Sequence, residues 1–274
     1  MRSMEGVIFG GILAFGLAFA QVVHAQPECS MDKWSGGATV PANAVGSPQS
    51  ASPVARYSEF CGLAVSAGAS GYVQSPATSD AHYFGRFYAH LGATGGTEAN
   101  LLVAYDGDDN PVVTVSYDGT NLNFDTANGG SGSAPAEAGK WNLVEFEFNS
   151  GGDFNVWVNQ DWDFVGAAYD STTIASFASG TGTITYVRLG APNGMGGFTG
   201  AFTFDAFEAH RTTNVGALRA CDAEGDSDVD INDVLAVVDE VFADPVILSS
   251  GQPDCDSNGS VNINDALAIV DLVF

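Results

Sequence analysis

Residues 141–158 read WNLVEFEFNSGGDFNVWV, and this stretch decides the fold of most of the chain. Apolar and polar side chains alternate on both sides of Ser150, Gly151 and Gly152, which are residues that favour turns. A period of two places successive side chains on opposite faces of a β-strand, so Glu145 and Glu147 share one face. The stretch predicts two antiparallel strands joined by a tight turn.

Similar runs recur along the chain before its C-terminal part, with almost no helical periodicity between them. Asp118 and Gly119 separate two of these runs and give a second hairpin signal. The further predicted strands are 82–91, 101–105, 112–117, 184–189 and 198–209. Short alternating strands separated by glycine, asparagine and aspartate are typical of a β-sandwich.

The order of these strands resembles the concanavalin A-like lectin/glucanase jelly roll. The resemblance rests on residues 141–148 and 154–159, on YVRLG at 186–190 and on the closing strand FTFDAFE at 202–208. It covers most of residues 29–211 and implies a jelly-roll β-sandwich. Because that family includes lectins, laminin-G-like modules, glycoside hydrolases and polysaccharide lyases, the fold alone does not give the chemistry.

A tandem repeat occupies the C-terminal part, where residues 222–242 recur 32 positions later as 254–274. The last twelve residues of the copies, INDVLAVVDEVF and INDALAIVDLVF, are identical at nine positions. Apolar residues at helical spacing predict two amphipathic helices that need a partner face. These residues are Leu235, Val238, Val241 and Phe242, and their counterparts Leu267, Val270, Val273 and Phe274.

Each predicted helix follows oxygen-bearing side chains at the spacing of a calcium loop, in which Ca²⁺ takes about six to eight oxygens. The second loop, residues 254–265, supplies Asp254, Asp256, Asn258, the Ser260 carbonyl, Asn262 and Asp265, with Gly259 at the turn position. The first loop, residues 222–233, supplies Asp222, Glu224, Asp226, the Asp228 carbonyl, Asp230 and Asp233, with Ser227 at the turn position. The spacing predicts two calcium ions, the first site being the weaker.

Both loops end in Asp where an EF-hand has Glu, and neither follows a clear entering helix. Two such EF-hand-like half-motifs in tandem resemble the dockerin domain, which implies two calcium ions and docking onto a cohesin-like module. The alternative is a solvated acidic tail, since residues 221–274 hold thirteen acids and no Lys or Arg. The helical spacing favours the module, and repulsion between its carboxylates predicts that calcium binding and folding are coupled.

Residues 1–25 have the pattern of a secretory signal peptide, with Arg2, an apolar run over 7–20, and a small-residue cleavage site before Gln26. The run is too short to span a bilayer, so we expect no membrane insertion and a secreted, extracellular or cell-surface protein. The remaining expected divisions are a sandwich over 26–211, a linker over 212–220 and a calcium module over 221–274.

Four cysteines in an exported chain are expected to form disulfides, with three connectivities open in principle. Pairs that stay inside one predicted module are favoured, which gives Cys29 with Cys61 and Cys221 with Cys255. The net charge of −25 argues against nucleic acid or an anionic membrane surface as a partner.

One predicted strand carries a candidate carbohydrate-binding face. Aromatic planes can stack on sugar rings, while cationic groups can hold uronate carboxylates, and polysaccharide lyases of this general fold use Arg, His and Tyr on the concave sheet. The face consists of His82, Phe84, Arg86, Tyr88 and His90, with Trp157 as a weaker candidate on another strand. We expect this face to be partly accessible and Tyr83, Phe87 and Leu91 to be buried; a merely polar outer face is the alternative.

The chain lacks the Glu-x-Asp-x-x-Glu motif of hydrolases with this fold, and Glu145 with Glu147 is more typical of a solvated strand face. It also lacks a G-x-S-x-G elbow and a zinc-binding His pair. We therefore favour a non-catalytic carbohydrate- or surface-binding protein with a calcium-dependent, dockerin-like attachment module. The alternatives are a polysaccharide lyase or glycoside hydrolase carried by a dockerin, and a structural matrix protein rigidified by calcium.

Overall fold

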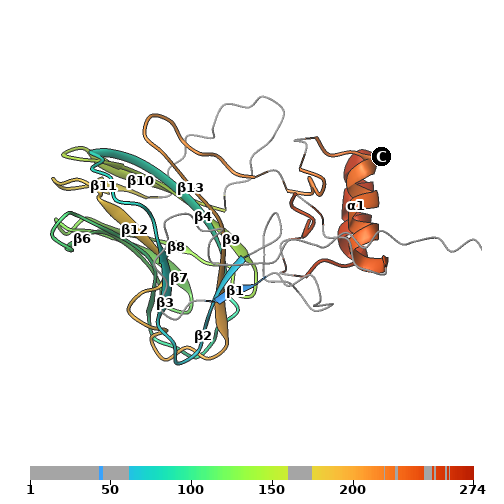
Figure 1. The fold of residues 1–274 in the computed structure, drawn as a ribbon, viewed down its shortest axis with the longest axis horizontal. Coiled ribbons are helices and arrows are strands. Elements are labelled where there is room, and N and C mark those ends of the chain that lie inside the picture. The colour runs from blue at the N-terminus through green and yellow to red at the C-terminus, as the bar shows by residue number, and fades with distance from the viewer. Residues whose placement is uncertain are drawn as a thin grey trace, which may run out of the picture.

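A computed structural model describes residues 43–45, 62–159, 175–218, 220–225, 228–243, 249, 251–256, 258 and 260–274. Two antiparallel sheets pack face to face, and two helices follow them (Figure 1). The predicted fold class, a mainly β jelly-roll sandwich followed by a small helical part, is confirmed. The expected signal peptide, Cys29 and Cys61 lie outside the described residues.

One sheet has seven strands and the other has six, and the chain passes repeatedly from one sheet to the other. The seven-stranded sheet runs in the order β1 (Asn43–Val45), β2 (Gly62–Ser66), β13 (Ala201–His210), β4 (His82–His90), β9 (Trp141–Asn149), β10 (Asp153–Val158) and β11 (Ala175–Ala178). The six-stranded sheet runs in the order β3 (Gly71–Gln74), β12 (Tyr186–Ala191), β5 (Ala99–Tyr105), β6 (Pro111–Tyr117), β7 (Asn121–Thr126) and β8 (Ser131–Pro135).

The hairpin predicted from residues 141–158 is confirmed, because β9 and β10 pair antiparallel with Phe148 opposite Phe154. Phe146, Phe148 and Phe154 are buried between the sheets. Directly opposite Phe146 lies Gly85, where an added Cβ would come within 2.6 Å of the Phe146 ring. Gly85 thus makes room for a large aromatic side chain in the core.

The core face of β4 agrees with the sequence, since Tyr83, Phe87 and Leu91 are buried between the sheets. The strands β1, β2, β3, β8 and β11 were not predicted. They are short, and their sequences NAV, GLAVS, GYVQ, SGSAP and ASFA contain few large apolar residues. Such strands form because they pair with neighbouring strands. The alternation within their own sequences is too weak to predict them.

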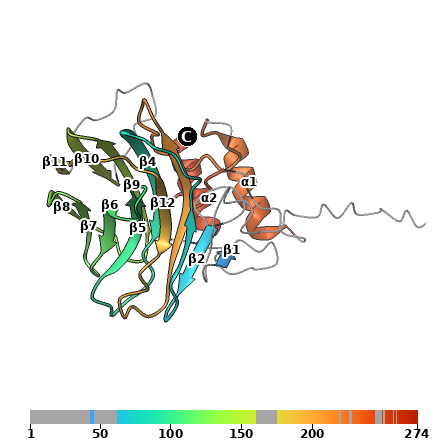
Figure 2. The same ribbon diagram turned by 60° about the vertical axis from the view of Figure 1, so that its left-hand side comes forward.

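The two predicted helices are present as α1 (Ile231–Phe242) and α2 (Ile263–Val273). They enclose a small core of their own, which includes Val237, Ala266 and Ile269. Figures 1 and 2 both show the helices on the side of the seven-stranded sheet, with the six-stranded sheet facing away from them. Within the described part of the chain, no helix is long and apolar enough to cross a membrane.

Candidate calcium module and the covered face of the sandwich

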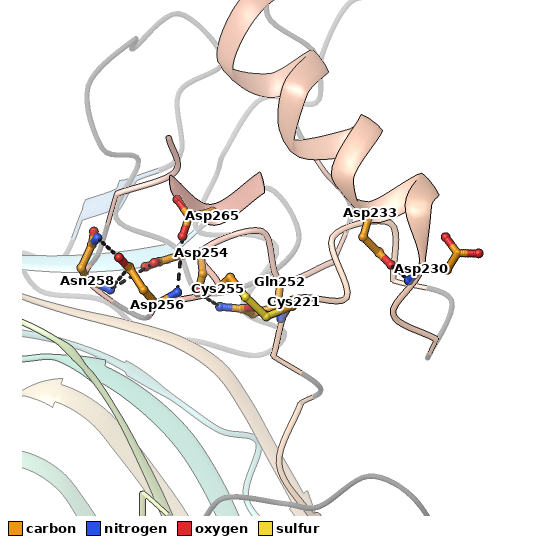
Figure 3. Close-up of a disulfide and its surroundings, with 9 residues drawn as sticks. All are labelled: Cys221, Asp230, Asp233, Gln252, Asp254, Cys255, Asp256, Asn258 and Asp265. Atoms are coloured by element: carbon orange, nitrogen blue, oxygen red, sulfur yellow. Dashed lines mark hydrogen bonds between the residues drawn. A yellow bond between two sulfur atoms is a disulfide. The ribbon is translucent and has the colours of Figure 1, made fainter. Parts of the chain in front are cut away.

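The second loop brings three of its predicted calcium ligands together. Carboxylate oxygens of Asp254, Asp256 and Asp265 lie within 4.8 Å of one another (Figure 3). Asp254 and Asp265 are buried, whereas Asp256 is exposed. Asn258 donates backbone hydrogen bonds to Asp254 at 3.0 Å and to Asp256 at 3.1 Å, which wraps the chain around the cluster.

The first loop repeats this construction. In the second loop, Asp265 accepts hydrogen bonds from the backbone nitrogens of Asp256 at 3.3 Å and Asn262 at 2.8 Å. In the first loop, Asp233 accepts from the backbone nitrogens of Glu224 at 3.1 Å and Asp230 at 2.7 Å. Each donor and acceptor is shifted by 32 positions, so the sequence repeat is also a structural repeat. Asp226, Ser227 and Gly259 lie outside the described residues.

The ninth position of each loop also begins a helix. Asp230 accepts a hydrogen bond from Asn232 N at 2.6 Å, and Asn262 accepts one from Asn264 N at 2.9 Å. In both copies the carboxylate at position twelve completes a capping box. The side chains that would hold a metal therefore also set where each helix starts.

The buried carboxylates fit a hard cation. Burial raises the pKa of Asp265, because a carboxylate removed from water without a counter-charge is destabilised. Residues 221–274 contain no Lys, Arg or His that could supply that charge locally. Oxygen-only side chains at this spacing match the preference of Ca²⁺. Asp254, Asp256 and Asp265 would hold an ion in the second loop, and Asp222 and Asp233 are the corresponding buried acids of the first.

A disulfide joins the two loops. Cys221, just before the first loop, is bonded to Cys255 in the second, as predicted (Figure 3). Beside it, Gln252 accepts a hydrogen bond from Cys221 N at 2.7 Å and donates from its side chain to the Asp254 carbonyl. Sequence reasoning missed Gln252, whose position between the loops is apparent only once they are placed back to back.

Backbone pairing reinforces this junction. Gly251 N donates to the Ala223 carbonyl at 2.8 Å, and Gln252 N donates to the Asp222 carbonyl at 2.6 Å. A Cβ on Gly251 would lie 2.0 Å from the Asp222 carbonyl oxygen, so only glycine permits this approach. The two loops therefore form one unit, in which the position of one constrains the other.

The helices leave an apolar surface uncovered. In the part of the chain that the structure describes, all exposed large hydrophobic side chains lie in α1, in α2 or at the end of α2. They are Ile231, Leu235, Phe242, Ile263, Leu267, Leu272 and Phe274. Three pairs, Ile231 with Ile263, Leu235 with Leu267 and Phe242 with Phe274, are related by the 32-residue repeat. We call these six side chains the helix stripes.

The predicted carbohydrate-binding face of β4 is not an open groove. Arg86, Phe84 and Tyr88 are buried, so the expectation that they are accessible is wrong. The reason is the linker, which crosses this outer face of the seven-stranded sheet: Leu218 N donates to the Tyr88 hydroxyl at 2.8 Å. Ala217 and Leu218 pack on a cluster of Tyr88, Trp141 and Leu143.

Arg86 and Glu145 hold the linker in place. Gly216 donates its N–H to the Glu145 carboxylate at 3.3 Å, and its carbonyl accepts from Arg86 Nη1 at 2.7 Å. Val215 N donates to Glu145 at 2.7 Å, and Arg86 pairs with Glu208 at 3.0 Å. Glu145 is fully buried, so the expectation of a solvated strand face is wrong at this position.

The remaining candidates of this face are also engaged. His82 lies 2.7 Å from Glu147, and Trp157 is buried. Burial lowers the pKa of His90, while hydrogen bonds to backbone groups of Gly139 and Asn258 oppose that shift. His90 thus lies between the sandwich and the second loop. Of the side chains on which the lyase alternative rested, Arg86 and Tyr88 are buried, whereas His82 and His90 are partly exposed, as expected.

No protein-family model matches the chain, and no curated protein matches it. Among solved structures, a cellulose induced protein is 14% identical, with a TM-score of 0.46 over 66% of this chain and 93% of that chain. The binding domain of botulinum neurotoxin serotype G is 10% identical, with a TM-score of 0.44 over 65% and 44%. An alginate lyase from Corynebacterium sp. is 14% identical, with a TM-score of 0.39 over 55% and 76%. The chain thus spans less than half of the neurotoxin domain, and similarities this weak carry no information on chemistry.

Proposed function

We propose that this is a secreted binding protein whose C-terminal module attaches it to a protein partner in the presence of calcium, while its β-sandwich recognises a polysaccharide or another surface ligand. The observation that carries the proposal is the set of helix stripes, which lie on two helices that each follow a carboxylate-lined loop. The proposed divisions are a signal peptide over 1–25, the sandwich over 26–211, a linker over 212–220 and the module over 221–274.

The helix stripes have the character of an interface. Leu235 and Leu267 are 55% and 56% exposed, although each lies mid-helix, where a monomeric protein normally buries a leucine or replaces it. The leucines, like the isoleucines of the stripes, have nearly the same exposure in both copies, which points to a partner that contacts two equivalent helices. A cohesin-like module, implied by the dockerin resemblance, is the proposed partner.

The proposed role of calcium is to stabilise the first turn of each helix. Asp233 and Asp265 each belong both to a proposed metal site and to a capping box. An ion bound to the loop would neutralise the buried carboxylate and fix the first turn of the helix that carries the stripe. Docking is therefore expected to require calcium.

Secretion is proposed on two features. The first 25 residues have signal-peptide character, and the disulfide between Cys221 and Cys255 is typical of an oxidising compartment.

The outer face of the six-stranded sheet points away from the helical module, which would leave this face free for a surface ligand while the module is docked (Figure 2).

The test is retention of the full mature chain on a panel of immobilised cohesin modules, in calcium and in excess EGTA. We expect retention in calcium only, and loss of about tenfold or more in affinity for the double variant Leu235→Asp with Leu267→Asp. Leu272→Asp is the matched control: Leu272 is 65% exposed but lies about 180° around α2 from Ile263, off the stripe.

Two results would count against the proposal. Retention that is equal in calcium and in EGTA would show that docking does not require bound calcium. An equal loss in Leu272→Asp and in the stripe variant would show that the stripes are not the interface.

A further inference from the structure

The cations of this chain point to a site that its sequence pattern did not reveal. The chain has 33 acids and only 8 Lys and Arg residues, so a basic side chain has an abundance of possible carboxylate partners. Among the described residues, Arg86, Lys140 and Arg211 each pair with a carboxylate, at 3.0, 3.2 and 2.7 Å. Arg188, the remaining described cation, makes no such ion pair within the described part of the chain.

Arg188 is instead surrounded by three tyrosines on the outer face of the six-stranded sheet. Its Cζ lies 4.9 Å from the ring centre of Tyr72, 4.6 Å from that of Tyr105 and 5.2 Å from that of Tyr186. Arg188 Nε donates to Gln74 Oε1 at 2.9 Å, which fixes the orientation of the guanidinium. Within the described part of the chain, its two terminal nitrogens donate no hydrogen bond, and the side chain is half-buried.

The tyrosines form a rigid wall for this guanidinium. The rings of Tyr105 and Tyr186 stack with centroids 5.1 Å apart, and both residues are largely buried. The Tyr186 hydroxyl donates to Asp109, and burial together with that hydrogen bond raises the pKa of Tyr186 to about 12. Because Tyr105 and Tyr186 are buried against each other and Gln74 fixes the guanidinium, Arg188 is held in one geometry before any ligand arrives.

A row of side chains continues from Arg188 across the sheet, and all but the buried Val103 are polar. Strand register places Arg188 opposite Val103, Val103 opposite Thr114, Thr114 opposite Asp125, and Asp125 opposite Ser131. With Gln74 opposite Arg188 at the other end, the row crosses all six strands and is about 24 Å long at the usual strand spacing. Val103 is buried, whereas Thr114, Asp125 and Ser131 are half-buried or exposed, so the row is open to solvent on either side of Val103.

The charges on this row are ordered. Arg188 lies near one end, and Asp125 lies three strands away, about 14 Å at the usual spacing. Glu98, which accepts a hydrogen bond from Ser116 at 2.8 Å, adds to the negative charge near Asp125. An anionic group is therefore favoured at Arg188 and disfavoured at the far end, where hydroxyl groups can donate to the carboxylate.

We infer that this row is the glycan-binding site of the sandwich and that its ligand is a uronate-containing polysaccharide lying across the strands. One uronate carboxylate accepts hydrogen bonds from the terminal nitrogens of Arg188, and neighbouring sugar hydroxyls contact Thr114, Asp125 and Ser131. The guanidinium fork matches the two oxygens of a carboxylate. This inference rests on the proposed polysaccharide-binding function of the sandwich and replaces the covered face of β4 as its site.

The test measures binding of digalacturonide, the shortest oligogalacturonide, to the full chain by calorimetry in calcium buffer, beside a neutral cello-oligosaccharide and poly-glutamate. Its two carboxylates can lie near Arg188 without reaching Asp125. Arg188→Gln should weaken oligogalacturonide binding about tenfold or more. Arg188→Lys should restore only part of the affinity, because it keeps the charge but not the fork. Tyr72→Ala is a second variant, since Tyr72 is half-buried and its loss opens the wall without removing charge.

Arg211→Gln is the matched control. It removes the same charge from an arginine that already pairs with Asp80 at 2.7 Å, and binding should stay within about twofold of the original protein. Equal losses in Arg211→Gln and Arg188→Gln would mean that only net charge matters, which overturns the site.

The remaining outcomes separate the site from the function. Oligogalacturonide binding that Arg188→Gln and Tyr72→Ala leave unchanged overturns the site and leaves polysaccharide recognition standing. No binding of either saccharide overturns both. Poly-glutamate bound as tightly as the oligogalacturonide identifies an acidic-peptide site and overturns the saccharide ligand.

Discussion

The disulfide between Cys221 and Cys255 connects the two candidate calcium loops to each other, with their Cα atoms 4.5 Å apart. Cys221 immediately precedes the first ligand position of one loop, and Cys255 follows the first ligand position of the other. The bond therefore stabilises the arrangement in which the two loops lie back to back. Chelation, reduction or a change at the junction should each affect both loops.

Replacing both cysteines, Cys221→Ser with Cys255→Ser, should lower the free energy of unfolding of the module by about 4 kcal/mol. The physical reason is the greater entropy of the unfolded chain once a loop closed over a separation of 34 residues is opened. Urea unfolding followed by the far-ultraviolet helix signal checks this, since α1 and α2 are the helices of the described chain. All four tryptophans precede residue 212, so tryptophan fluorescence reports the sandwich and should be unchanged.

Gly251→Ala should destabilise the same junction. The new methyl group would lie 2.0 Å from the Asp222 carbonyl oxygen and 2.6 Å from Gly225 N, so the paired backbones must separate. We expect a loss of about 1 to 3 kcal/mol in the helix-monitored unfolding free energy and weaker calcium binding at both loops. Gly107→Ala is the control, because its Cβ would meet only Thr185 Oγ1 at 3.7 Å; a loss as large there would remove the junction as the explanation.

Glu145→Ala should release the linker from the sandwich. Two backbone N–H groups, of Val215 and Gly216, lose their acceptor, and Arg86 stays buried beside them. We expect a loss of about 1 to 3 kcal/mol in sandwich stability and faster proteolysis within residues 212–218. Glu137→Ala, which removes an exposed acid paired with Lys140, should change stability by less than about 1 kcal/mol; equal proteolysis rates in both variants would contradict the linker contact.

The hairpin of β9 and β10 and the two loop–helix repeats could be predicted because their signals are local. The alternation of apolar and polar residues, the turn residues and the spacing of the metal ligands each occur within about twenty consecutive residues. The disulfide between Cys221 and Cys255 followed from the repeat, which places both cysteines in one module.

The covered face of β4 and the Arg188 row could not be predicted, because both depend on distant segments. Arg86 has the same sequence surroundings whether or not Gly216 crosses it, and residues 214–218 have no periodicity that reveals their position. Apart from Tyr186, two residues before it, the groups that distinguish Arg188 from a solvated arginine are Tyr72, Gln74 and Tyr105, which the strand order places on neighbouring strands. Periodicity assigns a side chain to a face, and what covers that face depends on the tertiary structure.

The central claim is that the C-terminal repeat is a calcium module, and calorimetric titration of the chelator-stripped full chain with calcium tests it most directly. We expect two ions per chain at unequal affinities, with Asp254→Ala weakening the tighter site more than Asp222→Ala weakens the other, and a gain in helix signal that magnesium does not reproduce. A chain that binds no calcium, or whose helix signal and stability are the same in calcium and in EGTA, would contradict the account.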